Sequence, residues 1–341
     1  MDDPVRTALD DAFPDREIEG LVGVGPSWNG GNETVGVDFA DGARAYLKTA
    51  IEGDGSRIAR ERSVLAHVAA TGRIRVPRII SADPDASVPY LATAPAPGRS
   101  LLDAVEAAAD DEEHVSLLRG VGRTLATLHE DTFDTHGEIV GSEGASGLRL
   151  ATGRWTEVLL ATIERTREIS TTDRLASHFD AVIDCVESNR DRLDGAPAAL
   201  LHGDIAEPNG FVVDGADHDT GAVRGRSPGD SPSDPPPIGL LDWELAHVGD
   251  PARDLVRARD QLCNDFDSDG PERLREAVCE GYRERAGGLP AGFAAREPVY
   301  RVVRVLGRSG FIDQWRTYLD TPTSELVTRI DAELDRRLAA V

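Results

Sequence analysis

Side chains that could do chemistry are concentrated in two short segments of the chain. The first contains Asp204 and Asn209, five residues apart, between an apolar run and a strand-like run. The second contains Asp242 at the end of another strand-like run, followed by a Gly-Asp-Pro tripeptide at 249–251. Carboxylates at strand ends, beside Asn and Gly, lie where loops can expose them to a ligand. We therefore take these two segments as the candidate site.

Phosphoryl transfer to an alcohol needs few protein groups, and the chain has a candidate for each. A carboxylate must orient the attacking hydroxyl, oxygen ligands must hold Mg²⁺, and a cation must contact the nucleotide phosphates. Asp204 fits the first role, and Asn209 and Asp242 are hard oxygen donors that fit the second. Lys48 fits the third, and Glu61 follows it by thirteen residues within a predicted helix. A Lys–Glu pair between strand and helix would hold the ammonium group in place.

The order of these motifs resembles a known family. His202-Gly203-Asp204 is followed by four residues and Asn209, and Asp242-Trp243-Glu244 is followed by the Gly-Asp-Pro tripeptide. This pattern resembles the aminoglycoside phosphotransferase and choline kinase families, the small-molecule branch of the protein-kinase-like fold. The resemblance extends from about residue 18 to residue 260. Gly203 and the Asp-Trp-Glu sequence differ from the Arg and Asp-Phe-Gly of protein kinases, which disfavours a protein-Ser/Thr kinase.

The resemblance implies ATP and Mg²⁺ as cofactors and a role for each motif. Asp204 would be the catalytic base, or would orient the acceptor hydroxyl, and Asn209 and Asp242 would bind Mg²⁺. Glycines of the loop at 27–32 would allow close backbone approach to the phosphates, and backbone near residue 94 would meet adenine. The nucleotide-binding residues implied in this way are Lys48, Glu61, Ser27, Gly30, Gly31, Thr93, Ala94 and Ala96.

The sequence predicts the roles of other polar residues near the motifs less specifically. We expect His202 to brace the catalytic loop, and Asp250 to accept hydrogen bonds from that loop and from the start of the next helix. Glu244 is either a third metal-site carboxylate or a solvated group. His247 is expected to be a surface or supporting residue, and Glu207 either tunes substrate preference or belongs to the general excess of acids.

The elements that position these residues follow from hydrophobic periodicity and turn signals. A short helix is predicted within 1–13, and a three-stranded antiparallel meander over 18–50 with an Asp41-Gly42 turn. A helix over 56–71 and two more strands complete a β-rich lobe at 1–94, with a linker at 94–100. The larger lobe, 95–341, is predicted to be mainly helical over 100–194 and 253–341. The expected fold is thus α+β, a two-lobed protein-kinase-like architecture.

A β-rich island interrupts the helices of the larger lobe. Its strand-like runs at 198–213 and 238–243 are separated by the segment 214–237, which is dominated by Asp, Gly, Ser and Pro. Such a segment cannot bury enough apolar surface to order itself, so we expect a mobile surface loop at the tip of a lengthened hairpin.

The composition excludes several classes of protein. There are 61 acidic and 37 basic residues, and the net charge of −24 disfavours nucleic-acid binding and docking on an anionic membrane. The acids are spread along the chain, which is typical of a salty cytoplasm, although a field that attracts a cationic substrate is the alternative. Three distant cysteines indicate a reduced, cytoplasmic protein. Only one of the 37 basic residues is a lysine, Lys48, which singles out that position.

The sequence therefore predicts an ATP- and Mg²⁺-dependent phosphotransferase that acts on a hydroxyl of a small molecule. A kinase-like nucleotide-binding module without transfer activity is one alternative. A metal-dependent hydrolase built on His202, Asp204 and Asp242 is another. The identity of the acceptor and the oligomeric state, monomer or dimer, are left open by the sequence.

Overall fold

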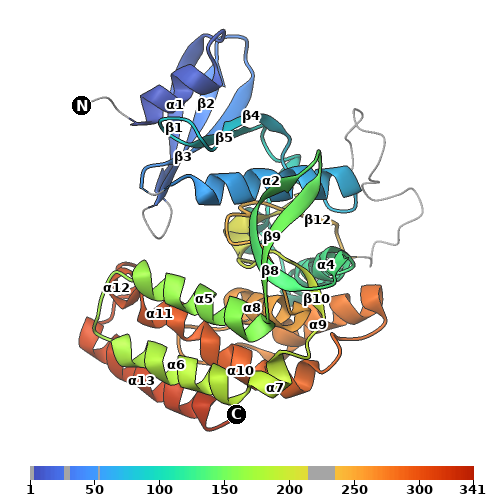
Figure 1. Ribbon diagram of the computed structural model, residues 1–341, viewed down its shortest axis with the longest axis vertical. Coiled ribbons are helices and arrows are strands. Elements are labelled where there is room, and N and C mark those ends of the chain that lie inside the picture. The colour runs from blue at the N-terminus through green and yellow to red at the C-terminus, as the bar shows by residue number, and fades with distance from the viewer. Residues whose placement is uncertain (1–3, 27–30, 53, 214–234) are drawn as a thin grey trace.

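A five-stranded antiparallel sheet forms one end of the molecule (Figure 1). The structure, a computed structural model, describes residues 4–26, 31–52, 54–213 and 235–341. The sheet has the order β1-β2-β3-β5-β4. Gly42, in the turn between β2 and β3, has a φ of 81°, which confirms the expected hairpin. The strands are β1 (Ile18–Pro26), β2 (Asn32–Phe39), β3 (Arg44–Ala50), β4 (Ile79–Asp83) and β5 (Tyr90–Thr93).

Two helices pack with this sheet and belong to different parts of the core. Helix α1 (Pro4–Ala12) covers a small cluster that includes Val37 and Leu47 of the sheet. Helix α2 (Ser56–Thr71) has the bounds expected from its periodicity, and its buried residues join the core of the larger lobe. In Figure 1, α2 crosses the molecule between the sheet and the C-terminal helices. The boundary at residue 94 stays a prediction, because one core cluster contains residues from both sides of it.

Residues 100–194 contain more strand than expected. Helices α3 (Leu101–Glu106), α4 (Asp111–Leu128), α5 (Trp155–Glu168), α6 (Ala176–Ser188) and α7 (Arg190–Leu193) agree with the prediction of a mainly helical segment. The prediction was incomplete, because this segment also contains a β-hairpin of β8 (His136–Glu143) and β9 (Gly147–Gly153). The hairpin was missed because its many glycines interrupt the alternation of polar and apolar residues that marks a strand.

Two small sheets carry the motif segments. One has the order β7-β10-β13-β8-β9, and the other has the order β12-β11-β6. Strands β11 and β12 pair antiparallel, with Gly210 opposite Leu240, so the expected hairpin is confirmed; most of its tip, residues 214–234, lies outside the described residues. The further strands are β6 (Gly98–Ser100), β7 (Thr132–Phe133), β10 (Ala198–Leu201), β11 (Gly210–Val213), β12 (Ile238–Leu240) and β13 (His247–Gly249).

Helices form the remainder of the larger lobe, as expected for 253–341. They are α8 (Pro251–Cys263), α9 (Glu272–Ala286), α10 (Phe293–Arg304), α11 (Leu306–Ser309), α12 (Ile312–Tyr318) and α13 (Thr323–Leu338). Trp155, the first residue of α5, is fully buried, and the Cβ of any larger residue at Gly249 would meet its ring at 2.5 Å. This contact fixes the path of β13 into α8. Among the described helices, none combines the length and the apolar character needed to cross a membrane.

Candidate active site

A short loop after β10 carries Asp204. Gly203 has a φ of 81°, and a Cβ atom there would lie 2.3 Å from the carbonyl oxygen of Leu245, so only glycine fits the turn. The His202 ring is buried; its Nε2 lies 2.8 Å from the carbonyl oxygen of Leu241, and its Nδ1 accepts from the Asp204 amide at 3.2 Å. His202 therefore braces the loop, as expected, and both of its ring nitrogens are engaged within the chain.

The backbone of this loop is held by Asp254 of α8. The two Asp254 oxygens accept from the amides of His202 and Gly203 at 2.6 and 3.0 Å. Burial raises the pKa of Asp254, but contacts with His129 and the other nearby histidines outweigh it and hold the pKa below its ordinary value. The carboxylate is therefore the form that accepts both amides.

Asp250 has only one of the two roles expected of it. It caps α8, accepting from the Ala252 amide at 3.0 Å, which agrees with the expected bond to the helix start. Among the described residues, its other side-chain hydrogen bonds are with Arg296 and Tyr300, whereas the loop amides bond to Asp254. The expected contact with the catalytic loop was wrong because the helix turns its second acid, rather than its capping acid, toward the loop.

Lys48 lies at the centre of three carboxylates. Its ammonium nitrogen is 2.8 Å from Glu61, 2.7 Å from Asp242 and 2.9 Å from Glu244. The expected Lys48–Glu61 contact is present, and Lys48 is only 12% exposed. Burial favours the neutral amine, but the three acids raise the pKa of Lys48 well above its ordinary value. We call Glu61, Asp242 and Glu244 the carboxylate cluster.

The carboxylate cluster has more negative charge than Lys48 can neutralise. One ligand oxygen from each of its three acids lies within 4.8 Å of the others. Burial raises the pKa of Glu61 to about 7, although Lys48 opposes the shift. Glu244 is buried and accepts from the Asn32 amide group at 2.5 Å, so it is not a solvated group. Hard oxygen donors around an excess of negative charge suit a divalent cation such as Mg²⁺.

Asn209 lies beside Asp242 because the strand after Asn209 pairs with the strand before Asp242. The Asn209 carbonyl oxygen accepts from the Leu241 amide at 2.9 Å, and the Asn209 side-chain amide donates to the Asp204 carbonyl at 2.9 Å. Asp242 has a φ of 59°, an unusual conformation for a residue other than glycine. The hairpin β11–β12 thus brings together the loop of Asp204 and the two residues expected to bind metal.

The segment expected to meet adenine follows β5. Thr93 ends the strand, and the Ala94 amide donates to the Arg78 carbonyl at 2.8 Å. Ala96 lies between Pro95 and Pro97, which have no amide hydrogen. Among the described residues, no backbone carbonyl accepts the Ala96 amide. Of the loop expected over the phosphates, Ser27 and Gly30 lie outside the described residues, and the Gly31 carbonyl accepts from Ile51.

A family model matches residues 29–223 and 230–298. The chain belongs to the phosphotransferase enzyme family. This match confirms the kinase-like fold class and the prediction of a phosphotransferase. A search of curated proteins found no match.

Solved structures of other phosphotransferases have the same fold as this chain. One is a putative aminoglycoside phosphotransferase from Ralstonia eutropha, with 14% identity, a TM-score of 0.61, and coverage of 98% of this chain and 97% of that one. Another is a macrolide 2'-phosphotransferase from Brachybacterium faecium, with 20% identity, a TM-score of 0.54, and coverage of 96% and 97%. A third, an aminoglycoside phosphotransferase in ternary complex with ADP and hygromycin B, has 15% identity, a TM-score of 0.59 and coverage of 98% of each chain.

Sequence reasoning missed several residues of this phosphotransferase site. Arg257 of α8 forms an ion pair with Asp204, and no motif signalled it. Asp254 follows Asp250 by one helical turn, and that spacing was the available signal. Arg60 of α2 donates to the Glu244 carbonyl at 2.9 Å. His247 is a buried supporting residue, since it accepts from Arg253 at 2.8 Å and stacks on Trp155.

Proposed function

We propose that this phosphotransferase moves the γ-phosphoryl group of ATP to a hydroxyl of a small molecule, with Mg²⁺ and with Asp204 as the catalytic base. The observation that carries the proposal is the convergence of three motif segments. The catalytic loop bonds to Asn209, the strand that follows Asn209 pairs with the strand before Asp242, and Asp242 contacts Lys48. A base, metal donors and a phosphate-binding cation therefore lie in one continuous network.

Each proposed role uses an atom that the site makes available. Asp204 would take the proton of the acceptor hydroxyl. Asn209 and Asp242 would hold Mg²⁺, which supplies positive charge on the transferring phosphoryl group when bound. Lys48 would contact the nucleotide phosphates while Glu61 holds its ammonium group. Glu244, which is buried beside them, is a further carboxylate for this cation site.

The nucleotide base would lie against the segment after β5. The Ala96 amide is the donor proposed for adenine, together with the backbone of Thr93 and Ala94. Support comes from the two prolines that flank Ala96 and from the use of the Ala94 amide within the sheet. Ser27, Gly30 and Gly31 are proposed to approach the phosphates, and the boundary between the two lobes near residue 94 is proposed to lie along the nucleotide site.

Replacing Asp204 with alanine tests the proposal. ADP release should fall by about 10²–10⁴-fold because the hydroxyl loses its base, while binding of ADP with Mg²⁺, followed by calorimetry, should survive. The screen should cover sugars, amino sugars, amino alcohols and nucleosides as acceptors. We propose a salt-rich cytoplasm as the working environment, so the assays use KCl at about 1 M to screen the repulsion among the acids.

The matched control is Asp184→Ala, an exposed aspartate of α6 outside the site. Its ADP release should equal that of the unaltered protein. Turnover of Asp204→Ala close to the unaltered level would contradict the role of Asp204. Retained nucleotide binding without ADP release from any acceptor, in the unaltered protein, would instead support the binding module without transfer activity.

A further inference from the structure

The wall beside Asp204 is rich in arginine, although the chain has a net charge of −24. Arg257 of α8 forms an ion pair with the Asp204 carboxylate. Arg253 and Asp260 lie about one helical turn before and after Arg257, on the same side of α8. A row of charged side chains therefore extends from Asp204 along α8 toward the C-terminal helices.

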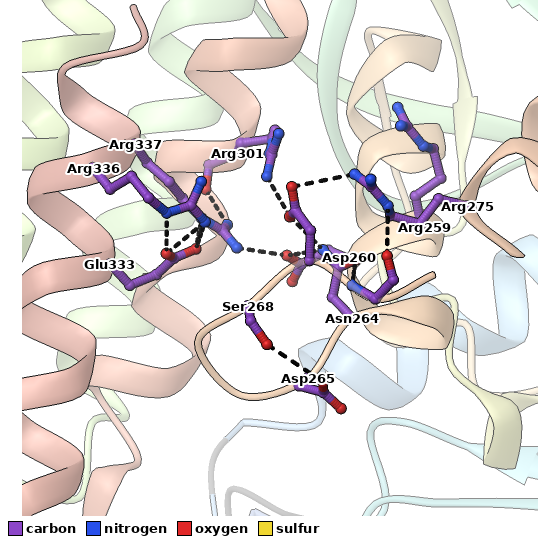
Figure 2. A network of polar contacts seen from close by, with 12 residues as sticks. Arg259, Asp260, Asn264, Asp265, Ser268, Arg275, Arg301, Glu333, Arg336 and Arg337 are labelled. Carbon is purple, nitrogen blue, oxygen red and sulfur yellow. Dashed lines mark hydrogen bonds and ion pairs between the residues drawn. The ribbon is translucent and has the colours of Figure 1, made fainter. Parts of the chain in front are cut away.

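Asp260 is surrounded by three guanidinium groups. Arg304 and Arg308 each lie 3.2 Å from one Asp260 oxygen, and Arg337 lies 3.0 Å from the other. Glu333 adds a second carboxylate, but Arg337 shares it with a further arginine (Figure 2). Asp260 is only 3% exposed, so water screens these charges little. We call Arg304, Arg308, Arg337 and Asp260 the arginine cluster.

Cations in this region are crowded and incompletely paired. Burial and the nearby Arg257 lower the pKa of Arg304 to about 9, and the same two causes lower that of Arg253 to about 10. Arg253 donates to the ring of His247 rather than to a carboxylate. In the part of the chain that the structure describes, Arg257 Nε is buried without a hydrogen-bond acceptor. A buried donor without an acceptor indicates that an oxygen atom from outside the chain completes the site beside Arg257.

The guanidinium groups beside Asp204 favour a ligand with negative charge. A guanidinium group binds carboxylate and phosphate oxygens through two parallel hydrogen bonds. An ammonium group placed on the same wall would meet like charge in a partly desolvated site, which disfavours it. The overall acidity of the chain therefore does not indicate a cationic acceptor, because the groups next to Asp204 have the opposite charge.

We propose that the acceptor is an alcohol that carries a carboxylate or a phosphate group, and that Arg257 binds this oxyanion. The inference rests on the proposed function. When Arg257 exchanges Asp204 for the oxyanion, the Asp204 carboxylate is released to accept the hydroxyl proton. The hydroxyl oxygen then forms a bond to the γ-phosphorus, the bond from that phosphorus to the bridging oxygen breaks, and ADP leaves with the bonding electrons.

A set of sugars with one ring and different charges tests this specificity by ADP release. Glucuronate and glucose 6-phosphate should have a kcat/KM about tenfold or more above that of glucose, and glucosamine should have the lowest value. The two anions also distinguish a carboxylate from a phosphate acceptor. Glucose or glucosamine as the best acceptor would overturn the inference while leaving the proposed function intact.

A binding measurement decides the case in which none of these sugars is turned over. Calorimetry with inorganic phosphate alone, and with acetate alone, should show one of them binding to the unaltered protein. Binding to Arg257→Gln should be about tenfold or more weaker, and Arg257→Lys should recover part of it. Binding that is absent, or equal in the unaltered protein and Arg257→Gln, would overturn the inference.

The control for this measurement is Arg329→Gln. Arg329 is ion-paired with Asp267 away from Asp204, so its replacement should leave anion binding unchanged. Binding of ADP with Mg²⁺ is measured on every variant as a test of folding and of the proposed function. A chain that binds anions through Arg257 but binds no nucleotide would contradict the proposed function and not the anion site.

Discussion

The carboxylate cluster and the arginine cluster are opposite arrangements of charge within one site region. In the first, three acids surround the single ammonium group of Lys48; in the second, three guanidinium groups surround the single carboxylate of Asp260. Burying charge without full pairing costs stability. The comparison teaches that each cluster carries the charge opposite to that of the partner proposed for it, a divalent cation at the carboxylate cluster and an anionic acceptor beside the arginines.

Net charge alone would have suggested the opposite acceptor. The chain repels anions at long range, yet salt screens exposed charges beyond about 10 Å. Buried groups are screened much less, so we propose that the local balance of charge near Asp204 decides which acceptor binds. The variants below alter the central ion of each cluster, or a group at its margin, to determine whether the two clusters differ as their charges imply.

The largest effect is expected from Lys48→Met. Removal of the central cation should lower kcat/KM for ATP by about 10²–10³-fold, because the contact proposed between Lys48 and the phosphates is lost. Steady-state kinetics of ADP release checks this. Arg44→Gln is the control, since Arg44 lies on the same strand but pairs with Asp38 at the surface, and its kinetics should be unaltered. A loss of less than about threefold in Lys48→Met would contradict the role of this cation.

Asp260→Asn should produce the largest loss of stability in the arginine cluster. Three buried guanidinium groups lose their shared carboxylate, so the free energy of unfolding should fall by about 3–5 kcal/mol. Urea denaturation in constant KCl measures it. Asp267→Asn breaks a more exposed pair with Arg329 and should cost less than about 1 kcal/mol. Equal losses in the two variants would show that the cluster is no more costly to break than a surface pair.

Lowering the pH should reduce the difference in stability between the unaltered protein and Asp260→Asn. Burial raises the pKa of Asp260, but Arg308, Arg304 and Arg337 outweigh it and hold the pKa well below its ordinary value. The folded protein therefore protonates Asp260 less readily than the unfolded chain does. The stabilisation from the ionised carboxylate is present above the ordinary pKa of aspartate and is lost as the pH falls below that pKa. The stability gap between the unaltered protein and Asp260→Asn should narrow between about pH 5.5 and about pH 3.5. A gap that is constant with pH would contradict this account.

The smallest effect is expected from Arg57→Gln at the margin of the carboxylate cluster. Arg57 lies 3.6 Å from Glu244, farther than Lys48, and is partly exposed. Its loss should change the free energy of unfolding by less than about 1 kcal/mol. Urea denaturation of Arg57→Gln and of Lys48→Met compares what each cation contributes to the free energy of unfolding. A cost well above that of a surface pair would mean that Arg57 shares the neutralising role of Lys48.

Much of the local structure could be predicted from the sequence. The helix over 56–71, the meander of β1–β3 and the pairing of β11 with β12 follow from periodicity and turn residues, which act between near neighbours. The order of the motif segments was sufficient to predict the family and the phosphotransferase activity. The hairpin at 136–153 was missed because half-exposed, glycine-rich strands give a weak periodic signal.

Only the tertiary structure decided which charges meet. Lys48 and Asp242 are 194 residues apart, Asp260 and Arg337 are 77 apart, and Asp204 and Arg257 are 53 apart. Spacing along a chain carries no information about such contacts, because the packing of helices and sheets brings them together. The sequence by itself determined the residue types that phosphoryl transfer needs. Folding determined the charge around each of them, since an electrostatic interaction depends on distance and burial.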